Sequence, residues 1–400
     1  MTNPTTVDKR WLGPGVAGIG TASFLADVGH EIPTALLPSL LTATLGAPAA
    51  ALGFVEGIAD GLAGIARLVG GAIADDPRRR RALAVGGYTT TAVLSSLVGA
   101  TTTVWQVGVL RAGAWAARGL RVPARNALLA DIAPPAVYGR AYGFERACDN
   151  LGAIAGPLLA LGLVGLVGVR TAIALSVIPG LLAALAIVYA IRHAPRAEQR
   201  ERQPLRLRVR PVLVGRLGRL MVGMSAFEFG NVAATLLILR ASELLVPGRS
   251  QDHATQLALG LYVAYNLAAT LASVPAGRLG DRRGAVLVLV LVLGVGLFGL
   301  AYAGFAAGGT SVLALAPWFV AAGVAIGCVE TAEHAAVAAL APVELRGSAF
   351  GLLAAVQSFG NLAASAIAGL LWTAVSPRAA FGYLVGWMLL ALVGLLAAGR

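Results

Sequence analysis

Apolar runs that are long enough to cross a membrane recur along this chain from about residue 14 onwards. A helix of about 20 residues spans the hydrocarbon layer of a bilayer, which is about 30 Å thick. Hydrophobic residues make up 58% of the chain and charged residues only 12%, a balance that excludes an ordinary soluble domain. We therefore predict twelve transmembrane helices, over residues 14–42, 50–74, 82–104, 106–132, 138–166, 170–192, 212–244, 254–279, 285–307, 311–340, 346–375 and 378–398.

Basic residues gather in alternate loops between these runs. Four arginines, Arg78 to Arg81, follow the second run, and seven arginines lie between Arg192 and Arg210, after the sixth. The other basic residues on the same side are Lys9, Arg10, Arg278, Arg282 and Arg283. Because short cytoplasmic loops collect lysine and arginine, both termini are expected in the cytoplasm. The net charge of +12 then follows from topology and requires no nucleic-acid partner. The basic linker is also able to contact anionic lipid headgroups.

Two stretches of the first half of the chain recur in the second half at nearly equal offsets. The segment GGAIADDPRRRR matches AGRLGDRRGAVL, with Gly71 and Asp75 lying 206 residues before Gly277 and Asp281. The segment ARNALLADIAPPAVYGRAYGF matches AEHAAVAALAPVELRGSAFGL at an offset of 208 residues. Near-equal offsets at two distant places indicate an internal duplication, which in many transporters surrounds a central binding site.

The segment GRLGDRRG is similar to the signature loop of the major facilitator superfamily, a family of secondary transporters. The residues that carry this resemblance are Gly277, Asp281, Arg282 and Gly284. In that family the loop resembles a latch on the cytoplasmic gate. Its glycines let helices approach closely, and its aspartate can pair with an arginine or with a helix N-terminus. The first copy keeps Gly71 and Asp75, but Asp76 stands where a basic residue is usual.

The resemblance covers essentially the whole chain and implies an all-α membrane protein. Its twelve transmembrane helices are expected to form two pseudo-symmetric six-helix bundles, over residues 1–192 and 212–400, joined by a basic cytoplasmic linker over residues 193–211. The resemblance further implies a monomer in the cell inner (plasma) membrane. The implied partners are a small-molecule substrate and protons.

A second motif lies in the fifth apolar run, GFERACDNLGAIAGPLLALG. It resembles the antiporter motif of the family's drug exporters, through Gly143, Gly152, Gly156 and Pro157. The final glycine pair of that motif is replaced by Ala160 and Leu161. Small residues at this spacing give a smooth face for close packing, and proline permits a helix to bend. The alternative is that this spacing serves ordinary helix packing.

Ionisable residues lie at helical spacing inside several of the apolar runs. At about 100° per residue, Asp27, His30 and Glu31 fall within an arc of about 100°, so all three can face the protein interior. A lone charge at the bilayer centre costs roughly 2.5–3.5 kcal/mol, so such groups must be paired or hydrated. The facing groups on other helices of the first half are Glu56, Asp60, Arg118, Arg125 and Asp149. We therefore predict a polar cavity lined by charges of both signs.

This cavity has the components of a proton-coupling site. A carboxylate in an apolar cavity holds its proton more strongly unless an arginine lies close by, so movement of an arginine can switch its charge. Asp27 and Glu31 are one turn apart and would repel each other if both were ionised, so one of them is expected to be protonated near neutral pH. The second-half residues predicted to face the cavity are Glu228 and Asn231. The alternative is that all of these groups form structural salt bridges.

Three classes of function are compatible with these features. The first is a proton-coupled antiporter that exports a small organic solute. The second is proton-driven uptake or divalent-metal export, since Asp27, His30 and Glu31 can act as metal ligands. The third is a receptor or membrane enzyme on a transporter scaffold, although the sequence contains no phosphate-binding glycine loop, HExxH motif or nucleophile elbow. No cofactor or resident metal is predicted, and Cys148 and Cys328 lack a metal-ligand spacing.

Overall fold

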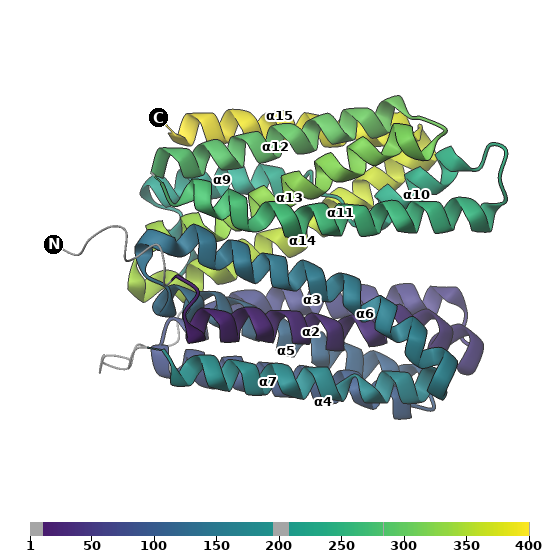
Figure 1. The fold of residues 1–400 in the computed structure, drawn as a ribbon, viewed down its shortest axis with the longest axis horizontal. Helices are drawn as coiled ribbons and strands as arrows, with labels where there is room; N and C mark the ends of the chain where they lie inside the picture. Colours follow the sequence, from purple (N-terminus) through teal and green to yellow (C-terminus); the bar gives the residue numbers. More distant parts are fainter. Residues whose placement is uncertain (1–10, 195–207, 283, 400) are drawn as a thin grey trace. The chain divides into compact units, whose positions relative to one another are not determined.

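The computed structural model describes residues 11–194, 208–282 and 284–399. Over these ranges the chain forms helices and no β-strand (Figure 1). The long helices before residue 194 are α2 (Pro14–Ser39), α3 (Ala49–Ala74), α4 (Pro77–Leu97), α5 (Val104–Ile132), α6 (Tyr138–Leu175) and α7 (Val177–Arg192). After residue 208 the chain forms the short helix α8 (Val209–Val212). The longer helices that follow are α9 (Gly215–Glu228), α10 (Ala234–Leu245), α11 (Gln251–Gly280), α12 (Gly284–Ala307), α13 (Val312–Leu340), α14 (Arg346–Ala374) and α15 (Pro377–Gly399).

Eight helical segments within the described ranges are long and apolar enough to cross a membrane. One of them, Pro135–Arg192, contains both α6 and α7 and accounts for two passes. The remaining passes are formed by α2, by α5, and by α9 together with α10. In the part of the chain that the structure describes, the helices therefore make the predicted twelve passes.

The turn between the fifth and sixth passes is made inside α6. Gly168 has φ +77° and ψ 167°, a conformation that a residue with a side chain rarely adopts. The glycine interrupts the helix where the sequence predicts a loop, between residues 166 and 170. The residues that follow Gly168 continue through a turn at Ser176 into α7.

The seventh pass differs from the prediction of one continuous helix, because residues 229–233 separate α9 from α10. Backbone groups that a break frees inside a membrane must find partners in the protein. Here the N–H of Val232 donates to the hydroxyl of Tyr302 at 3.1 Å, and the N–H of Ala233 donates to the Ser365 hydroxyl at 2.9 Å. The prediction is wrong because the side chains that stabilise the break come from α12 and α14, far away in sequence.

Helix starts follow local sequence signals. α4 begins at Pro77, where the missing N–H would have had no helical partner, and the Asp76 side chain accepts a hydrogen bond from the Arg78 N–H at 2.9 Å. α5 begins with a capping box, in which Thr103 and Gln106 each bond to the other's backbone N–H. These caps satisfy backbone donors at the membrane ends of the helices.

Contacts between residues divide the chain into two compact units. Unit 1 comprises Met1–Val137, Cys148–Val212 and Ala341–Ala355, and unit 2 comprises Tyr138–Ala147, Leu213–Leu340 and Val356–Arg400. The start of α6 therefore groups with unit 2, and the start of α14 groups with unit 1. The predicted division at residues 193–211 stays a prediction. Residues 195–207 of that linker lie outside the described residues, as do Lys9, Arg10 and Arg283.

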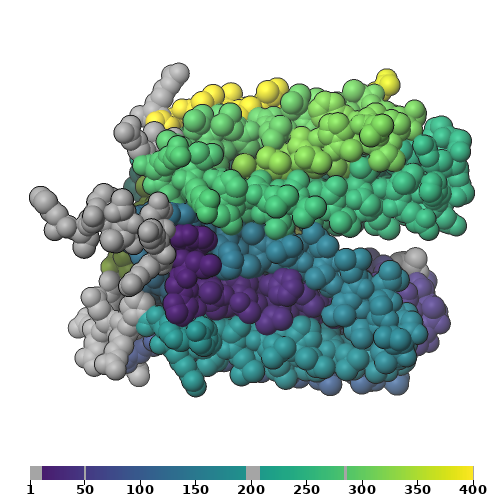
Figure 2. All heavy atoms as spheres, in the orientation of Figure 1, coloured from purple at the N-terminus to yellow at the C-terminus, as the bar shows by residue number. Residues whose placement is uncertain are grey.

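Small residues allow close contact between helices within each unit. In unit 1, Gly70 of α3 lies against the backbone of Leu120 in α5, and in unit 2, Gly327 of α13 lies against the backbone of Ala269 in α11. On the face drawn in Figure 2, heavy atoms cover the grooves between neighbouring helices of each unit. Because lipid tails are as apolar as the helices, this close packing, rather than a hydrophobic effect, holds the helices together.

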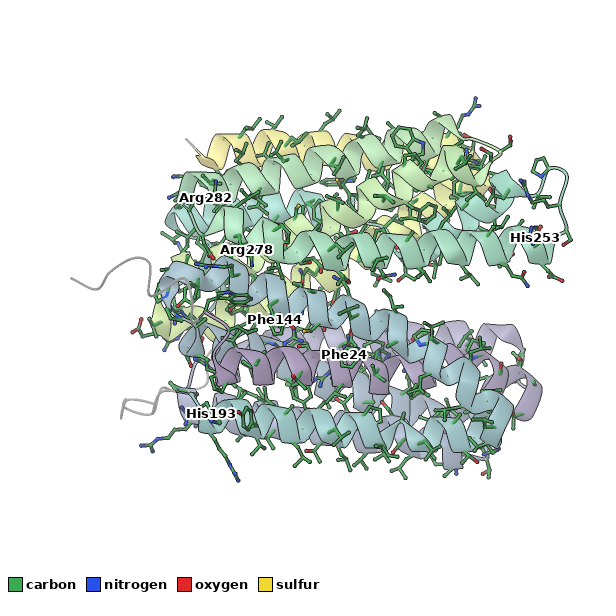
Figure 3. All side chains as sticks on the ribbon, in the orientation of Figure 1. Phe24, Phe144, His193, His253, Arg278 and Arg282 are labelled. Carbon is green, nitrogen blue, oxygen red and sulfur yellow. The ribbon has the colours of Figure 1, made fainter. Side chains whose placement is uncertain are left out.

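The charged and histidine residues of helix α11 in unit 2 lie at or just beyond its two ends. His253 lies at the N-terminal end, and Arg278 and Arg282 lie at the opposite end (Figure 3). All three side chains have exposed surface, and the helix between them is mainly apolar. This is the distribution expected of a helix that spans the bilayer and has basic residues on one side of the membrane.

Candidate functional site

Asp27 of α2 and Arg118 of α5 form an ion pair inside unit 1. Arg118 Nη2 donates to Asp27 Oδ1 at 3.1 Å, and Asp27 is only 6% exposed. His30, on the next turn of α2, meets the ring of Trp115 edge to face at a centroid distance of 4.4 Å. Glu31 is half-buried beside it. The structure thus brings together a carboxylate and a fourth-pass arginine that the sequence assigns to the cavity.

A second ion pair lies nearer the start of α5. Arg111 Nε donates to Glu56 Oε1 of α3 at 3.0 Å, and Arg111 Nη2 donates to the Thr34 hydroxyl of α2 at 3.0 Å. Asp60, one turn after Glu56, is exposed and forms no ion pair with any residue in the described ranges. Arg111 therefore joins α2, α3 and α5, although it was not among the predicted site residues.

Arg125 of α5 connects α2 to α6. Its Nη1 donates to the Ser23 hydroxyl at 2.9 Å and lies 3.5 Å from Asp149 Oδ1, while its Nε donates to Asn126 Oδ1 at 3.2 Å. Arg125 is buried, so its charge is balanced by a carboxylate from the fifth pass. The predicted residues Arg125 and Asp149 are thus direct partners.

The glycines of the predicted antiporter motif lie against the acidic face of α2. A Cβ at Gly152 would overlap the Phe24 carbonyl and the Asp27 Cβ, and a Cβ at Gly156 would overlap the Glu31 Cβ. Pro157 follows inside the same helix and is half-buried. The first motif glycine, Gly143, belongs to unit 2 and lies against the Ser273 backbone of α11. The motif and the carboxylates, which the sequence predicts separately, therefore form one contact in unit 1.

In unit 2 the break after α9 places Glu228 and Asn231 together. Asn231 Nδ2 donates to Glu228 Oε2 at 3.1 Å, and Asn361 of α14 donates to the Asn231 carbonyl at 2.7 Å. Glu228 is 2% exposed, and Gly360 leaves no room between α14 and the Glu228 backbone. The two predicted residues are therefore part of the polar support of the broken helix.

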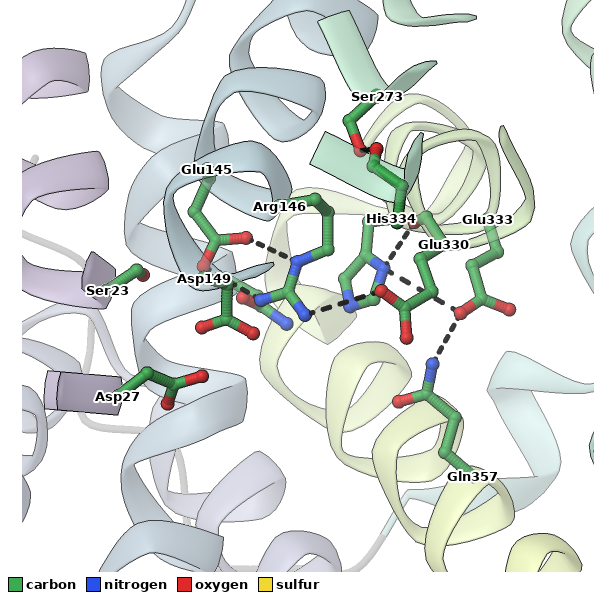
Figure 4. Close-up of polar contacts among 12 residues, drawn as sticks. Ser23, Asp27, Glu145, Arg146, Asp149, Ser273, Glu330, Glu333, His334 and Gln357 are labelled. Carbon is green, nitrogen blue, oxygen red and sulfur yellow. Dashed lines mark hydrogen bonds and ion pairs between the residues drawn. The ribbon is translucent and has the colours of Figure 1, made fainter. Parts of the chain in front are cut away.

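A buried carboxyl group on α13, Glu333, was not among the predicted site residues. Glu333 has no exposed surface, and Gln357 of α14 donates a hydrogen bond to its Oε1 (Figure 4). Among the described residues its Oε2 has no hydrogen-bond partner. The neighbouring His334 lies with Nδ1 2.7 Å from the Glu330 carbonyl oxygen, an acceptor, so Nδ1 carries a proton.

Arg146 of α6 lies in the same cluster of unit 2 (Figure 4). Its Nε donates to Glu145 Oε2 at 2.7 Å, and its Nη1 lies 3.9 Å from Glu330 Oε2. Both Glu145 and Arg146 are buried, at 1% and 8% exposure. The start of α6 therefore brings a paired arginine to the polar cluster of α13.

The two aspartates of the predicted gate motif each cap the start of a helix. Asp281 accepts hydrogen bonds from the Gly139 N–H at 2.6 Å and from Arg140, whose Nε lies at 2.8 Å, at the start of α6 in unit 2. Asp75 accepts from the Ser348 N–H at 2.8 Å and from the Ser348 hydroxyl, at the start of α14 in unit 1. Free N–H groups and the helix dipole both favour a carboxylate there.

The motif glycines make these contacts possible. Gly277 lies against the Gly139 backbone, and Gly71 lies against Gly347 and Gly351, with no room for a Cβ at either motif position. The other predicted members are Arg282, which is exposed, and Gly284, which begins α12.

Burial opposes ionisation of both aspartates, which lie beyond the spanning parts of α3 and α11. Burial raises the pKa of Asp281 above its usual 3.8, while the hydrogen bonds from Arg140 and Gly139 act in the other direction. Burial likewise raises the pKa of Asp75, against the hydrogen bonds from Ser348. In each case desolvation is the larger effect.

The internal repeat is the signal that could have identified the missed partners. Arg125 and Asp149 lie 208 residues before Glu333 and Gln357, and both pairs are in direct contact. Arg140, which binds Asp281, similarly precedes Ser348, which binds Asp75, by 208 residues. Equivalent positions of the two repeats are therefore in contact in both units, although the residues at those positions differ.

The described residues contain no group of three histidine, cysteine or acidic side chains arranged to hold a metal ion. In particular, the ring of His30 packs on Trp115, and Asp27 is paired with Arg118.

The sequence matches a profile described as the Major Facilitator Superfamily over residues 19–245 and 220–399. An uncharacterized MFS-type transporter of Methanocaldococcus jannaschii is 28% identical over 392 residues, which cover 97% of this chain and 95% of that relative.

Two solved structures share the fold. The human organic anion transporter has a TM-score of 0.73 at 16% identity, over 96% of this chain and 99% of that chain. A bacterial homologue of the iron transporter ferroportin, in an outward-facing state, has a TM-score of 0.75 at 16% identity, over the same shares. At these identities the structures show the fold alone.

Proposed function

Because this chain belongs to the Major Facilitator Superfamily and is a secondary transporter, we propose that it is a proton-coupled antiporter that exports a small organic solute. One observation carries this proposal. The acidic face of α2, with Asp27 and Glu31, lies directly on Gly152 and Gly156 of the motif that resembles that of drug exporters. The proposed proton-binding carboxylates of α2 therefore contact α6, the helix that carries this motif.

The Asp27–Arg118 pair supplies a switch. A buried ion pair is a poor device for stability, because an apolar pair of similar volume would do as well or better. When Arg118 is close, it favours ionised Asp27, and when Arg118 moves away, Asp27 takes up a proton. The released guanidinium can then pair with a neighbouring carboxylate. Antiport requires that the proton and the solute exclude each other, and this follows if a cationic group of the solute takes the place of Arg118 beside the ionised Asp27 carboxylate, which a proton would neutralise.

Glu333 supports the same function from unit 2. Burial disfavours the charged form of a carboxyl group. Glu333 is fully buried, accepts a hydrogen bond from Gln357 and has its Oε1 3.8 Å from His334 Nδ1. Its neighbours Glu330 and Arg146 form an ion pair that can alter this balance if Arg146 shifts. We propose Glu333 as a second proton-binding position.

The proposed topology places both termini in the cytoplasm of the cell, with the chain in the inner (plasma) membrane. Arg278 and Arg282 at one end of α11 support this orientation. Asp75 and Asp281 then lie at the cytoplasmic ends of α3 and α11, where their contacts with Ser348 and Gly139 serve as latches. The proposed active form is a monomer.

The test follows proton movement by the purified full-length protein in liposomes that contain a pH-sensitive dye. A panel of cationic, zwitterionic and anionic organic solutes is added outside, and the pH of the lumen is recorded. Antiport predicts that solute entry drives protons out, so the lumen becomes more alkaline. Acidification of the lumen on solute entry would instead establish symport, and with it the uptake alternative.

Two substitutions test whether the carboxylates of α2 couple solute transport to proton movement. Asp27→Asn and Glu31→Gln should each abolish the solute-linked proton signal or reduce it at least tenfold, with folding intact. Asp252→Asn is the matched control, because this carboxylate is exposed in the first turn of α11. A full proton signal in both Asp27→Asn and Glu31→Gln would return these residues to a structural role.

A further inference from the structure

The start of the seventh pass carries a basic surface in unit 2. α9 begins at Gly215, and the side chains of Arg216 and Arg219 in its first two turns are exposed. Within the described ranges, neither of these side chains forms an ion pair or a hydrogen bond. No aspartate or glutamate occurs in the sequence between Glu201 and Glu228, and Glu228 is buried. The charges of the two arginines are therefore not balanced by neighbouring carboxylates of the same helix.

The basic ends of two other helices do contain acidic residues. At the start of α4, Asp76 lies 3.6 Å from Arg79. At the end of α11, Asp281 accepts a hydrogen bond from Arg140 at 2.8 Å. The orientation of a membrane protein requires arginines at such ends, but it does not require that carboxylates be absent. The start of α9 thus has a positive charge that membrane topology alone does not explain.

Apolar side chains are exposed on both sides of these arginines. Leu213 and Val214 directly precede α9 and are exposed, and Val222 is 64% exposed. Arg216, Arg219 and Val222 follow one another at intervals of three residues, so they share one side of the helix within an arc of about 120°. The buried residues on the opposite side are Leu217, Leu220, Met221 and Met224. The exposed side of α9 is therefore basic at the membrane end and apolar further along.

The apolar part of this surface continues onto α15. A Cβ at Gly223 of α9 would lie 3.0 Å from the Leu395 nitrogen, and a Cβ at Gly394 of α15 would lie 3.2 Å from the Gly223 Cα. The two helices therefore meet backbone to backbone. Val393, which precedes Gly394, is 67% exposed. Exposed valines thus lie beside the contact on both helices, about 10 Å along the axis from the start of α9 at 1.5 Å per residue.

The chemistry of this surface indicates its partner. Guanidinium groups bind phosphate through paired N–H donors. A free phosphate ion would meet the arginines but would leave Leu213 and Val214 uncovered. An acidic peptide would stay in water, whereas Val222 lies in the spanning part of the helix. A phospholipid with a net negative charge supplies both a phosphate at the membrane end and acyl chains beyond it.

We propose that an anionic phospholipid binds to unit 2 at the start of α9, with its phosphate at Arg216 and Arg219 and its acyl chains along Val222 and Val393. This surface lies on the helix itself, after the basic linker. The bound lipid fixes the depth in the membrane of α9, the half-helix that ends at Glu228 beside the break. This inference does not depend on the proposed antiport.

The test measures thermal unfolding of the purified full-length protein in detergent micelles. The micelles contain increasing fractions of phosphatidylglycerol, or of phosphatidylcholine with the same acyl chains, whose headgroup has no net charge. Phosphatidylglycerol should raise the unfolding midpoint by roughly 2 °C or more in a saturable manner, because a ligand of the folded state stabilises it. Phosphatidylcholine, and inorganic phosphate at equal ionic strength, should leave the midpoint unchanged.

Substitutions locate the effect. The double variant Arg216→Gln with Arg219→Gln should raise the half-saturating fraction of phosphatidylglycerol roughly thirtyfold, the value expected for two arginines at an anionic lipid surface. Arg216→Lys with Arg219→Lys keeps both charges and should retain most of the response. The matched control is Arg78→Gln with Arg192→Gln, which removes two exposed arginines from helix ends of unit 1 and should respond as the wild type does.

Three results would each overturn the proposal. Equal midpoints in phosphatidylglycerol and phosphatidylcholine would show that anionic lipid is not preferred. An equal response to inorganic phosphate would show that the arginines bind a free ion. Equal losses in the two glutamine double variants would show that lipid follows the overall charge of the protein and not this surface. All four substituted arginines are exposed, so these outcomes can be read without a folding defect.

Discussion

Gly156 of α6 lies so close to Glu31 of α2 that a side chain at position 156 would overlap the Glu31 Cβ. The contact joins a residue of the motif that resembles that of drug exporters to a carboxylate of the proposed coupling site. In the proposed antiport, this contact is where α2 and α6 move against each other.

Gly156→Ala should reduce solute-linked transport at least tenfold. The added methyl group forces α2 and α6 apart, and overpacking of this kind typically costs about 1–3 kcal/mol of stability. Gly162→Ala on the same helix is the control, because a Cβ there meets nothing within 4 Å. Transport rates and unfolding of both variants are measured in parallel. Equal transport by the two variants would contradict a role for the contact.

Arg118→Gln should destabilise the protein by about 3 kcal/mol, because it leaves Asp27 buried without its cation. The double variant Asp27→Asn with Arg118→Gln should recover most of that loss, since no unpaired charge remains. A double-mutant cycle on the free energy of unfolding in detergent measures the coupling. Additive effects of the two substitutions would show that the pair contributes nothing beyond its separate members.

The Asp281 contact should depend on pH in a defined direction. Burial raises the pKa of Asp281 above 3.8 in the folded protein, so its contribution to stability is fully present below pH 3.8. That contribution is lost as the pH rises through the raised value. The difference in unfolding free energy between wild type and Asp281→Asn should therefore fall from pH 3.8 upwards. A difference that rises with pH would mean that Arg140 outweighs burial.

Glu333→Gln should leave stability at neutral pH unchanged or slightly higher, because a neutral amide replaces a buried acid. The proton-linked transport signal should fall in the same variant. Gln357→Leu should instead lower the free energy of unfolding by about 1–3 kcal/mol, since the buried Glu333 carboxyl loses the hydrogen bond that Gln357 donates. Chemical unfolding and the liposome proton assay distinguish these effects. Full proton coupling in Glu333→Gln would remove this residue from the mechanism.

Tyr302→Phe should destabilise the break between α9 and α10 by about 1–3 kcal/mol, because the Val232 N–H loses its acceptor inside the membrane. Tyr383→Phe on α15 is the matched control. Its hydroxyl is buried without a partner among the described residues, so its removal should be neutral or stabilising. Equal losses in both variants would indicate that the hydrogen bond from the Val232 N–H is not the cause of the loss.

The positions of the helices could largely be read from the sequence. Apolar length, arginine placement and the 206- and 208-residue offsets are properties that one chain shows without its fold. Asp27 and Glu31 could be assigned to one face by helical spacing alone, because 3.6 residues per turn is a local rule.

The partners of those residues could not be read in the same way. That Asp27 pairs with Arg118, while Arg125 pairs with Asp149, depends on helix rotation and on glycine contacts such as Gly156 with Glu31. The break in the seventh pass depends on Tyr302, which is distant in sequence. The membrane class, the number of passes and the duplication therefore follow from the order of the amino acids alone, since apolarity and spacing act locally. Which charges meet depends on the folded chain, since pairing inside a membrane involves helices that approach from far along the sequence.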